Sequence, residues 1–357
     1  MTASQKLKVG FIGAGFIATY HSKSIRRAEQ NLNFKIERAG VFDIDQARAI
    51  AFAEASGHQM MTSPEEVIDS SDVIYICTWT SEHLDLVRKI TQASKALFCE
   101  KPLATNLADA AEIVRLCRQS NITNQVGLVL RHSPAYVLAR DLVHSPESGR
   151  VMSVVFRDDQ FIPIQGHYGS NWRSDVAKAG AGTLLEHSIH DIDMLHFVIG
   201  PITDVSARQS FFHGISGIED VLTTHFSFAP LQSSGESAVG SLTSIWHDNL
   251  ARPSLRRVEI FCEKRFITID GDDWFGPVSW TNSDGSTGCL AGDELVSATR
   301  DLIQSDPNPD AAFLNSAYTN SPAYPDVAIA LSAHQTVNAI YRSAHSGSTN
   351  VQVGEFK

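Results

Sequence analysis

The sequence lacks the features that mark several classes of protein. It has no basic excess, since 29 Lys and Arg stand against 40 Asp and Glu and the net charge is −11, which argues against a nucleic-acid-binding surface. No apolar run approaches the roughly 20 residues that span a bilayer. The N-terminus, MTASQKLKVGFIG, enters a strand-like run too early to leave room for a signal peptide. We therefore expect a cytoplasmic protein that binds neither nucleic acid nor membrane.

The cysteines are too few and too scattered for a disulfide framework or a zinc site. There are five, an odd number, and no two are spaced as Cys-x-x-Cys. This pattern predicts reduced thiols in the cytosol. The chain has 357 residues, of which 43% are apolar, enough to build two folded cores. Only 19% are charged, which is too few for a disordered chain.

The first 130 residues alternate short apolar runs with segments of helical periodicity. This alternation predicts a parallel sheet that is covered by helices on both faces. The expected strands are 8–12, 37–42, 73–77, 96–99 and 125–130. The expected helices between them are 45–56, 82–93 and 107–120, the last with Asn106 as its N-cap.

After residue 150 apolar and polar residues alternate with period two, which predicts an antiparallel sheet. The expected strands are 152–156, 205–212, 222–228, 239–246, 258–262 and 266–269. A long helix over 326–344 and a short tail strand are expected to close the chain. The segment 304–325 is rich in Pro, Asn, Ser and Asp, and we expect it to be a loop.

A glycine-rich turn follows the first strand and opens a helix. It reads Gly13-Ala-Gly15-Phe16-Ile17-Ala18, the pattern G-x-G-x-x-A. Gly13 permits the tight turn, Gly15 lets a pyrophosphate approach the backbone, and Ala18 keeps helix and strand close. The phosphates would lie at the helix N-terminus, where unpaired N–H groups favour negative charge. We therefore predict a Rossmann-type dinucleotide site, with Phe16 and Ile17 among its contacts.

Asp43 ends the second predicted strand, where a carboxylate accepts hydrogen bonds from a ribose diol. It lies 28 residues after Gly15, and a longer helix and loop around 27–35 account for this spacing. A carboxylate at this place disfavours the extra phosphate of NADP, so the sequence favours NAD. The alternative is that Asp43 caps the helix over 45–56.

These features predict an α/β protein of two domains. Residues 1–130 are expected to form a Rossmann NAD-binding domain. Residues 131–357 are expected to form an α+β substrate-binding and oligomerisation domain with a large, mainly antiparallel open sheet. The final helix is expected to pack back on the first domain.

Glu100-Lys101-Pro102 stands at the carboxyl end of the predicted strand 96–99. Ligands of open α/β sheets bind at such strand ends. A lysine beside a nicotinamide donates to the substrate oxygen, stabilises the alkoxide and exchanges a proton. Lys101 is therefore a candidate catalytic residue that contacts both cofactor and substrate, and Glu100 is a candidate cofactor contact. The alternative, for this triplet taken alone, is that Lys101 is a surface lysine.

A second polar group lies in the segment 172–200. After Gly180 and Gly182 a helix is expected, in which Glu186, His190 and Asp193 follow at i, i+4 and i+7 and share one stripe. A histidine takes an alcohol proton near neutral pH, and a nearby acid orients it or holds another hydroxyl. The neighbouring stripe, expected to face the core, consists of Leu185, Ile189, Ile192, His196 and Ile199.

The glycine loop, Glu100-Lys101-Pro102 and the acid–histidine helix together resemble the Gfo/Idh/MocA family, that of glucose–fructose oxidoreductase and inositol dehydrogenase. The resemblance covers essentially the whole chain, down to the segment 339–347. It implies that His190 is the catalytic histidine and that Glu186 takes the place of the family's aspartate. Here Glu replaces Asp and His187-Ser188 replace a small or apolar pair, so the substrate cannot be copied from the best-known relatives.

The resemblance also implies further contacts. Trp172-Arg173 is similar to the family's Trp-Arg motif, and Arg131 stands in a segment similar to its Arg-Phe-x-Pro. The implied substrate contacts are Lys101, Arg131, Trp172, Arg173, Glu186, His187 and His190. The segment after the fourth strand, where the family has Thr-Pro-x-x-x-His, adds as cofactor contacts Thr78, Trp79 and His83.

The acid–histidine helix has two alternative interpretations. A metal held by Glu186, His187 and His190 is disfavoured, because the Lys101 cation would occupy the same space, and we expect none. A purely structural interdomain network is the second alternative.

The residues and the resemblance together predict an NAD-dependent oxidoreductase that acts on a secondary alcohol of a sugar, sugar derivative or cyclitol. The second sheet is expected to pack against another copy in a homodimer or homotetramer. Two other functions stay open at this point: a glycosidase that recycles NAD, and a non-catalytic nucleotide sensor.

Overall fold

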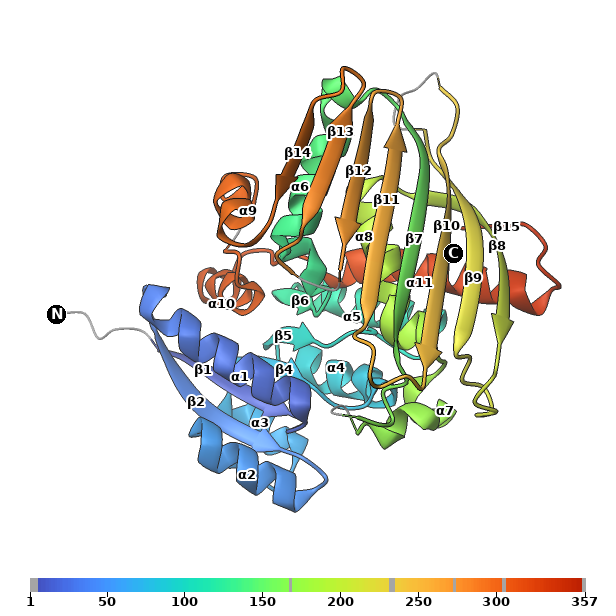
Figure 1. The fold of residues 1–357 in the computed structure, drawn as a ribbon. Coiled ribbons are helices and arrows are strands. Elements are labelled where there is room, and N and C mark those ends of the chain that lie inside the picture. The colour runs from blue at the N-terminus through green and yellow to red at the C-terminus, as the bar shows by residue number, and fades with distance from the viewer. Residues whose placement is uncertain (1–5, 167–168, 231–234, 272–273, 304–305, 355–357) are drawn as a thin grey trace. The chain divides into compact units, whose positions relative to one another are not determined.

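The computed structural model in Figure 1 describes residues 6–166, 169–230, 235–271, 274–303 and 306–354. The chain divides into two compact units. Unit 1 comprises Met1–Val129 and Ser305–Leu331, and unit 2 comprises Leu130–Gln304 and Ser332–Lys357. None of the helices that the structure describes is both long and apolar enough to cross a membrane.

Unit 1 is built on a parallel sheet, whose strands among the described residues run in the order β3-β2-β1-β4-β5-β6. The strands are β1 (Lys6–Ile12), β2 (Lys35–Phe42), β3 (Gln59–Met60), β4 (Val73–Ile76), β5 (Ala96–Cys99) and β6 (Asn124–Val126). The chain changes direction across the sheet between β1 and β4. In open α/β sheets, ligands bind at the carboxyl ends of the strands on either side of such a point.

Helices cover both faces of this sheet, as the alternation predicted (Figure 1). Successive residues of β4 show this, because Val73 and Tyr75 join one apolar cluster whereas Ile74 and Ile76 join the other. The helices are α1 (Phe16–Ala28), α2 (Gln46–Ser56), α3 (Pro64–Ser70), α4 (His83–Gln92), α5 (Leu107–Ser120) and α10 (Pro309–Thr319). The predicted N-cap of α5 is confirmed, since the Asn106 side chain accepts from the N–H of Asp109 at 3.0 Å.

Two expectations for unit 1 are wrong. The segment 304–325 is not a loop throughout, because it contains α10. Asn308 caps this helix and Pro309 occupies its first turn, so the residues that indicated a loop are a helix start. The strand expected over 125–130 ends at Val126, and Val129–His132 is a 3-10 turn.

Unit 2 is built on a second sheet, whose described strands run in the order β14-β13-β12-β11-β7-β10-β9-β8-β15. The pair β7 and β10 is parallel and the other neighbours are antiparallel, as a mainly antiparallel sheet requires. The strands are β7 (Val151–Phe161), β8 (Ile202–Ser210), β9 (Val221–Phe228), β10 (Val239–His247), β11 (Leu255–Cys262), β12 (Arg265–Asp270), β13 (Val278–Asn282), β14 (Thr287–Leu290) and β15 (Val351–Gln352).

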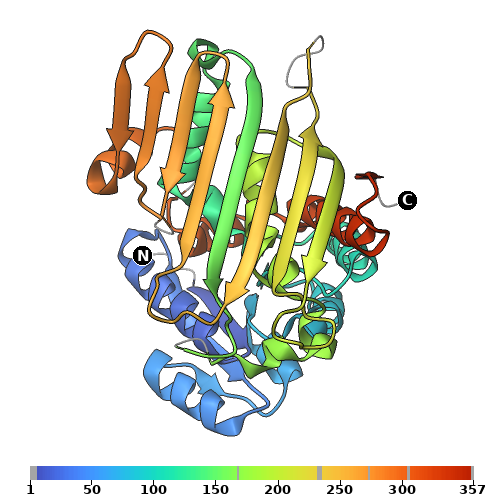
Figure 2. The ribbon, with the colours of Figure 1, turned by 45° about the vertical axis from the view of Figure 1, so that its right-hand side comes forward.

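Helices pack against one face of this sheet, where the apolar core of unit 2 lies. They are α6 (Pro134–His144), α7 (Val176–Ala179), α8 (Ile189–Val198), α9 (Gly292–Thr299) and α11 (Val327–His345), of which α11 begins in unit 1. Figure 2 shows the opposite face, over which no helix of the described residues lies. The strands alternate accordingly, and Val155, Val239 and Phe261 remain exposed.

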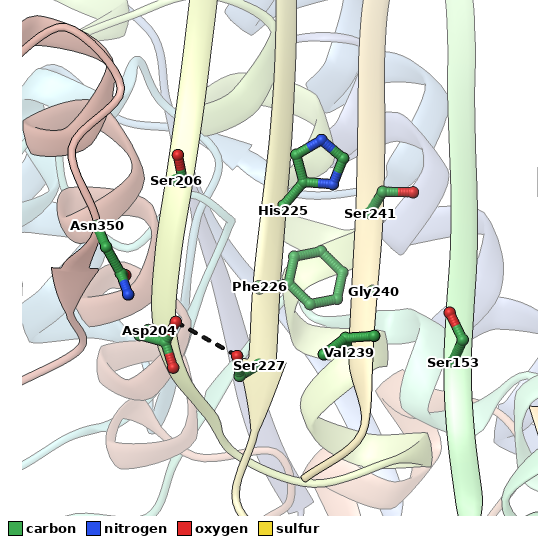
Figure 3. Close-up of a pocket in the computed structure, with 10 residues that line it drawn as sticks. All are labelled: Ser153, Asp204, Ser206, His225, Phe226, Ser227, Val239, Gly240, Ser241 and Asn350. Carbon is green, nitrogen blue, oxygen red and sulfur yellow. Dashed lines mark hydrogen bonds between the residues drawn. The ribbon is translucent and has the colours of Figure 1, made fainter.

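The helix-free face carries a shallow hollow across β7, β8, β9 and β10 (Figure 3). Its floor is rich in hydroxyl groups, and Ser227 donates a hydrogen bond to Asp204 at 3.3 Å. It is lined by Ser153, Asp204, Ser206, His225, Phe226, Ser227, Val239, Gly240, Ser241 and Asn350. None of the predicted site residues lies in it.

Candidate functional site

The glycine loop lies where β1 ends and α1 begins. Gly13 has φ of 94°, and a Cβ there would lie 2.5 Å from the backbone of Cys77, at the end of β4. This close approach of two strand ends requires glycine. At Gly15 a Cβ would meet nothing within 4 Å, so glycine is not required there by the protein's own packing. The open space before the N-terminus of α1 is a cradle that fits a dinucleotide pyrophosphate.

The three residues after Gly15 begin α1. The Phe16 side chain is exposed, Ile17 is half-buried, and Ala18 is fully buried against the sheet. Ala18 therefore keeps helix and strand close, as predicted from the motif.

Asp43 follows β2 and holds the glycine loop from the side. Its Oδ2 accepts from the N–H of Ala14 and its Oδ1 from the N–H of Asp45, each at 2.8 Å. The N-cap of α2 is Asp45, which overturns the alternative that Asp43 caps this helix. A carboxylate oxygen can accept two hydrogen bonds, so Asp43 can also accept hydrogen bonds from a ribose diol.

The segment after β4 contributes Thr78, Trp79 and His83. Thr78 and Trp79 are half-buried, and Trp79 is the N-cap of a 3-10 turn over Thr80–Glu82. His83 begins α4 and is buried, with its Nδ1 3.3 Å from the carbonyl oxygen of Leu103. Burial lowers the pKa of His83, so its ring is neutral at pH 7. The ring supports the segment that follows Lys101.

Glu100 and Lys101 lie at the carboxyl end of β5, the neighbour of β4. Glu100 is buried, and its Oε2 accepts from the main-chain N–H of Lys101 at 3.1 Å. Its Oε1 lies 2.9 Å from Nε2 of His21, a residue of α1 that the sequence did not single out. The Lys101–Pro102 peptide bond is cis.

In unit 2, the acid–histidine segment begins with a π-helical turn over Leu184–Ser188, which leads into α8. Such turns insert an extra residue and occur often at functional sites. A buried carboxylate fixes this one, since Glu219 accepts from the N–H of Gly182 at 2.8 Å and of Leu184 at 3.0 Å. Tyr341 also donates to Glu219, at 2.8 Å.

Glu186 lies in this π-turn and is 2% exposed. Its Oε2 accepts from Nε of Arg173 at 3.1 Å, and the Arg173 guanidinium stacks on the ring of Trp172 at 4.5 Å. The structure therefore brings together three of the predicted substrate contacts. His190 is half-buried one helical turn further on.

Asp193 and Arg131 form a separate pair. Nε of Arg131 lies 2.9 Å from Asp193 Oδ2, and Nη2 lies 2.6 Å from Oδ1. Burial raises the pKa of Asp193 although Arg131 opposes this. The structure differs here from the prediction, because Asp193 is buried against Arg131 and does not extend an open stripe with Glu186 and His190.

His187 joins a buried cluster that the sequence did not reveal. Its Nε2 lies 2.7 Å from Asp158 on β7. Arg256 on β11 bridges Asp158 and Asp191, at 3.0 Å to each. One feature of the sequence could have indicated this cluster: Asp158 is a charged residue at an inward position of an alternating strand, where an apolar residue is usual.

The predicted site residues are divided between the two units. Unit 1 holds the glycine loop, Asp43, Thr78, Trp79, His83, Glu100 and Lys101. Unit 2 holds Arg131, Trp172, Arg173, Glu186, His187 and His190. Within the described residues, no group of three or more His, Cys, Asp or Glu is arranged to hold a metal ion.

A glycine loop at the switch point of a parallel sheet, followed in the chain by a mainly antiparallel sheet, defines a two-domain dinucleotide-binding protein. Residues 7–128 match the model of the oxidoreductase family with an NAD-binding Rossmann fold, and residues 136–268 match the GFO/IDH/MocA C-terminal domain. The chain belongs to the Gfo/Idh/MocA family, as its motifs indicated.

Curated relatives support this assignment. Inositol 2-dehydrogenase 2 of Paenarthrobacter aurescens is 32% identical over 257 residues, which cover 67% of this chain and 68% of the relative. Levoglucosan dehydrogenase of Pseudarthrobacter phenanthrenivorans is 28% identical over 67% of this chain and 59% of its own length. The chain spans 58% and 62% of two other relatives, an uncharacterized oxidoreductase of Bacillus subtilis and 1,5-anhydro-D-fructose reductase of Ensifer adhaerens.

Solved structures show the same fold over nearly the whole chain. A levoglucosan dehydrogenase in complex with NADH matches with a TM-score of 0.86 at 20% identity and covers 99% of this chain and 100% of that one. The WlbA dehydrogenase of Bordetella pertussis, in complex with NADH and UDP-GlcNAcA, matches with a TM-score of 0.83 at 18% identity, covering 100% of both chains.

Proposed function

We propose that this protein is an NAD-dependent oxidoreductase that transfers hydride between the nicotinamide and a secondary alcohol or ketone of a sugar, sugar derivative or cyclitol. The observation that carries the proposal is Lys101 at the carboxyl end of β5, the strand edge at which a Rossmann fold binds its dinucleotide. The relatives named inositol 2-dehydrogenase and levoglucosan dehydrogenase support a polyol or sugar as substrate.

In the direction of oxidation, His190 takes the proton of the substrate hydroxyl, and Lys101 stabilises the negative charge that develops on the oxygen. The nicotinamide, when bound, accepts the hydride. Glu186 holds a neighbouring hydroxyl or orients His190, and its ion pair with Arg173 keeps the carboxylate in place.

The cofactor is held by the open glycine cradle and by groups around it. Asp43 binds the ribose diol and disfavours the 2′-phosphate of NADP. The proposed set of cofactor contacts is Gly13, Gly15, Phe16, Ile17, Ala18, Asp43, Thr78, Trp79, His83, Glu100 and Lys101.

The substrate contacts proposed in unit 2 are Arg131, Trp172, Arg173, Glu186, His187 and His190. Arg131 and His187 already bond to Asp193 and Asp158, so these two residues shape the pocket through fixed partners. His187 and Glu186 depart from the family's usual residues, and we propose that they narrow the choice of polyol.

We also propose that the protein acts in the cytoplasm as a homodimer or homotetramer. All five cysteines are free thiols, as a reducing compartment requires. The helix-free face of the unit 2 sheet exposes Val155, Val239 and Phe261 and is the proposed interface. Light scattering that showed only monomer would contradict this assembly.

The reaction is tested by absorbance of reduced nicotinamide across a panel of cyclitols and aldoses, with NAD and separately with NADP. Reduced cofactor is expected to appear with NAD and at least one polyol. Faster reduction of NADP than of NAD would contradict the role of Asp43.

A further inference from the structure

His21 lies between two carboxylates in the interior of unit 1. It is 1% exposed, its Nε2 lies 2.9 Å from Oε1 of Glu100, and its Nδ1 lies 2.7 Å from Oδ1 of Asp310. Asp310 is fully buried in the first turn of α10, beside α1. Tyr75 and Phe98 pack against the ring, with centroids 5.4 Å and 4.7 Å away.

Both ring nitrogens of His21 therefore face acceptors, which only the imidazolium satisfies with two donors. Burial alone would lower the pKa of His21, but Asp310 and Glu100 together raise it to about 10. Other buried titratable groups also lie near the two carboxylates, namely Tyr75, Cys77, Cys99 and His83. Burial raises the pKa of the tyrosine and of both thiols and lowers that of His83, so all four are neutral. His21 is thus the cation between the two carboxylates.

The same unit contains a second buried histidine, His58, whose imidazole is neutral. His58 is 8% exposed, and its Nδ1 bonds to the Ser56 hydroxyl at 2.8 Å, where His21 has a carboxylate. Burial, with the nearby charge of Arg38, lowers the pKa of His58 to about 4. His58 is therefore a matched control for a buried imidazole that carries no charge at pH 7.

Glu100 links His21 to Lys101. One carboxylate oxygen bonds to His21 and the other accepts the main-chain N–H of Lys101. Gly127 leaves room for this carboxylate, because a Cβ there would lie 2.6 Å from Oε1. Each carboxylate oxygen thus has a partner, and we expect a change in the position of the carboxylate to alter its hydrogen bond to the Lys101 main chain.

We propose that His21 is a positioning residue for Lys101: held by Asp310 on one side, it fixes the Glu100 carboxylate on the other, and Glu100 in turn holds the Lys101 main chain. This inference rests on the proposed catalytic role of Lys101 and deepens it. Without the imidazolium, the two buried carboxylates lose the donor and the positive charge that they share, so their hydrogen bonds rearrange.

The charge of His21 is tested in the wild-type protein by NMR of ¹⁵N-labelled histidine, with His21→Gln used to assign the signal. His21 is expected to show two protonated nitrogens from pH 5 to pH 9, whereas His58 stays neutral down to about pH 5. A His21 signal that titrates near the ordinary value of about 6.5 would overturn the proposal.

The link to Lys101 is tested by hydrogen exchange and by kinetics. In His21→Gln, the amide of Lys101 is expected to exchange at least about tenfold faster, and kcat to fall about 100-fold, since small misplacements of a catalytic group cost this much. The Kd for NADH is expected to change less than about threefold. His58→Gln is expected to leave all three quantities unchanged.

Asp310→Asn provides a second variant if His21→Gln does not fold, and it is expected to show the same exchange and the same loss of kcat. An unchanged Lys101 amide in either folded variant would overturn the inference even if the enzyme is active. A wild-type protein without turnover on any polyol would instead contradict the proposed function, while the NMR and exchange results would still decide the inference.

Discussion

Asp158 and Asp191 share the single guanidinium of Arg256 in the interior of unit 2, and their pKa values separate as a result. Burial alone would raise the pKa of Asp158, but Arg256 and His187 hold it well below its usual range. Burial and the charge of Asp158 raise the pKa of Asp191 well above its usual range. Asp191 therefore takes up a proton more readily than Asp158 does.

This difference predicts unequal effects of two isosteric substitutions. Asp191→Asn places a neutral amide where burial and Asp158 already disfavour a charge, and it is expected to change the free energy of unfolding by less than about 1 kcal/mol. Asp158→Asn removes the charge that balances Arg256 and is expected to cost about 3 kcal/mol or more. Urea unfolding of both variants measures this, and equal losses would contradict the assignment of charge.

At the scale of elements, the turn from β1 into α1 contains a glycine that the fold requires, Gly13, and a glycine for which we propose a role in binding, Gly15. Gly13 has a positive φ and no room for a Cβ, whereas Gly15 has a φ of −77° and open space. The two residues lie in one loop, so they form a matched pair.

Gly15→Ala is expected to change the free energy of unfolding by no more than about 1 kcal/mol and to weaken NADH binding about tenfold or more, because the methyl group fills the phosphate cradle. Gly13→Ala is expected to destabilise the fold by about 2 kcal/mol or more. Urea unfolding and NADH fluorescence titration measure both variants. Unchanged NADH affinity in folded Gly15→Ala would place the cofactor elsewhere.

The sequence predicted elements best where a local signal determines them. Asn106 correctly predicted the start of α5, and period-two alternation correctly predicted the sheet of unit 2. The sequence did not predict α10, because Asn308 and Pro309 are as typical of loops as of helix N-termini. The burial of Phe313 and Leu314, which distinguishes the two, is known only from the structure. The π-turn before α8 was missed for a similar reason, since Glu219 and Tyr341, which fix it, are distant in the sequence.

The residues of the candidate site were likewise predictable from the sequence where a local motif contains them. The glycine loop and Glu100-Lys101-Pro102 are short motifs, and each lies within one continuous segment from which its chemistry can be predicted. His21 with Asp310, 289 residues apart, and Asp158 with His187 and Arg256 are pairings made by tertiary structure. Each contains a buried charge whose partner no local pattern specifies.

At the scale of the whole molecule, the two residues that we propose to handle protons belong to different units of one chain, Lys101 to unit 1 and His190 to unit 2. The proposed cofactor cradle lies in unit 1. A change in either residue should therefore stop turnover while the cofactor cradle stays intact.

The most direct test compares reduction of NAD by the wild type, Lys101→Ala and His190→Ala with the polyol that the panel identifies. We expect turnover to fall at least about 100-fold in both variants, while the Kd for NADH stays within about threefold of the wild type. Full turnover in Lys101→Ala, or loss of NADH binding in place of turnover, would contradict the proposed role of Lys101.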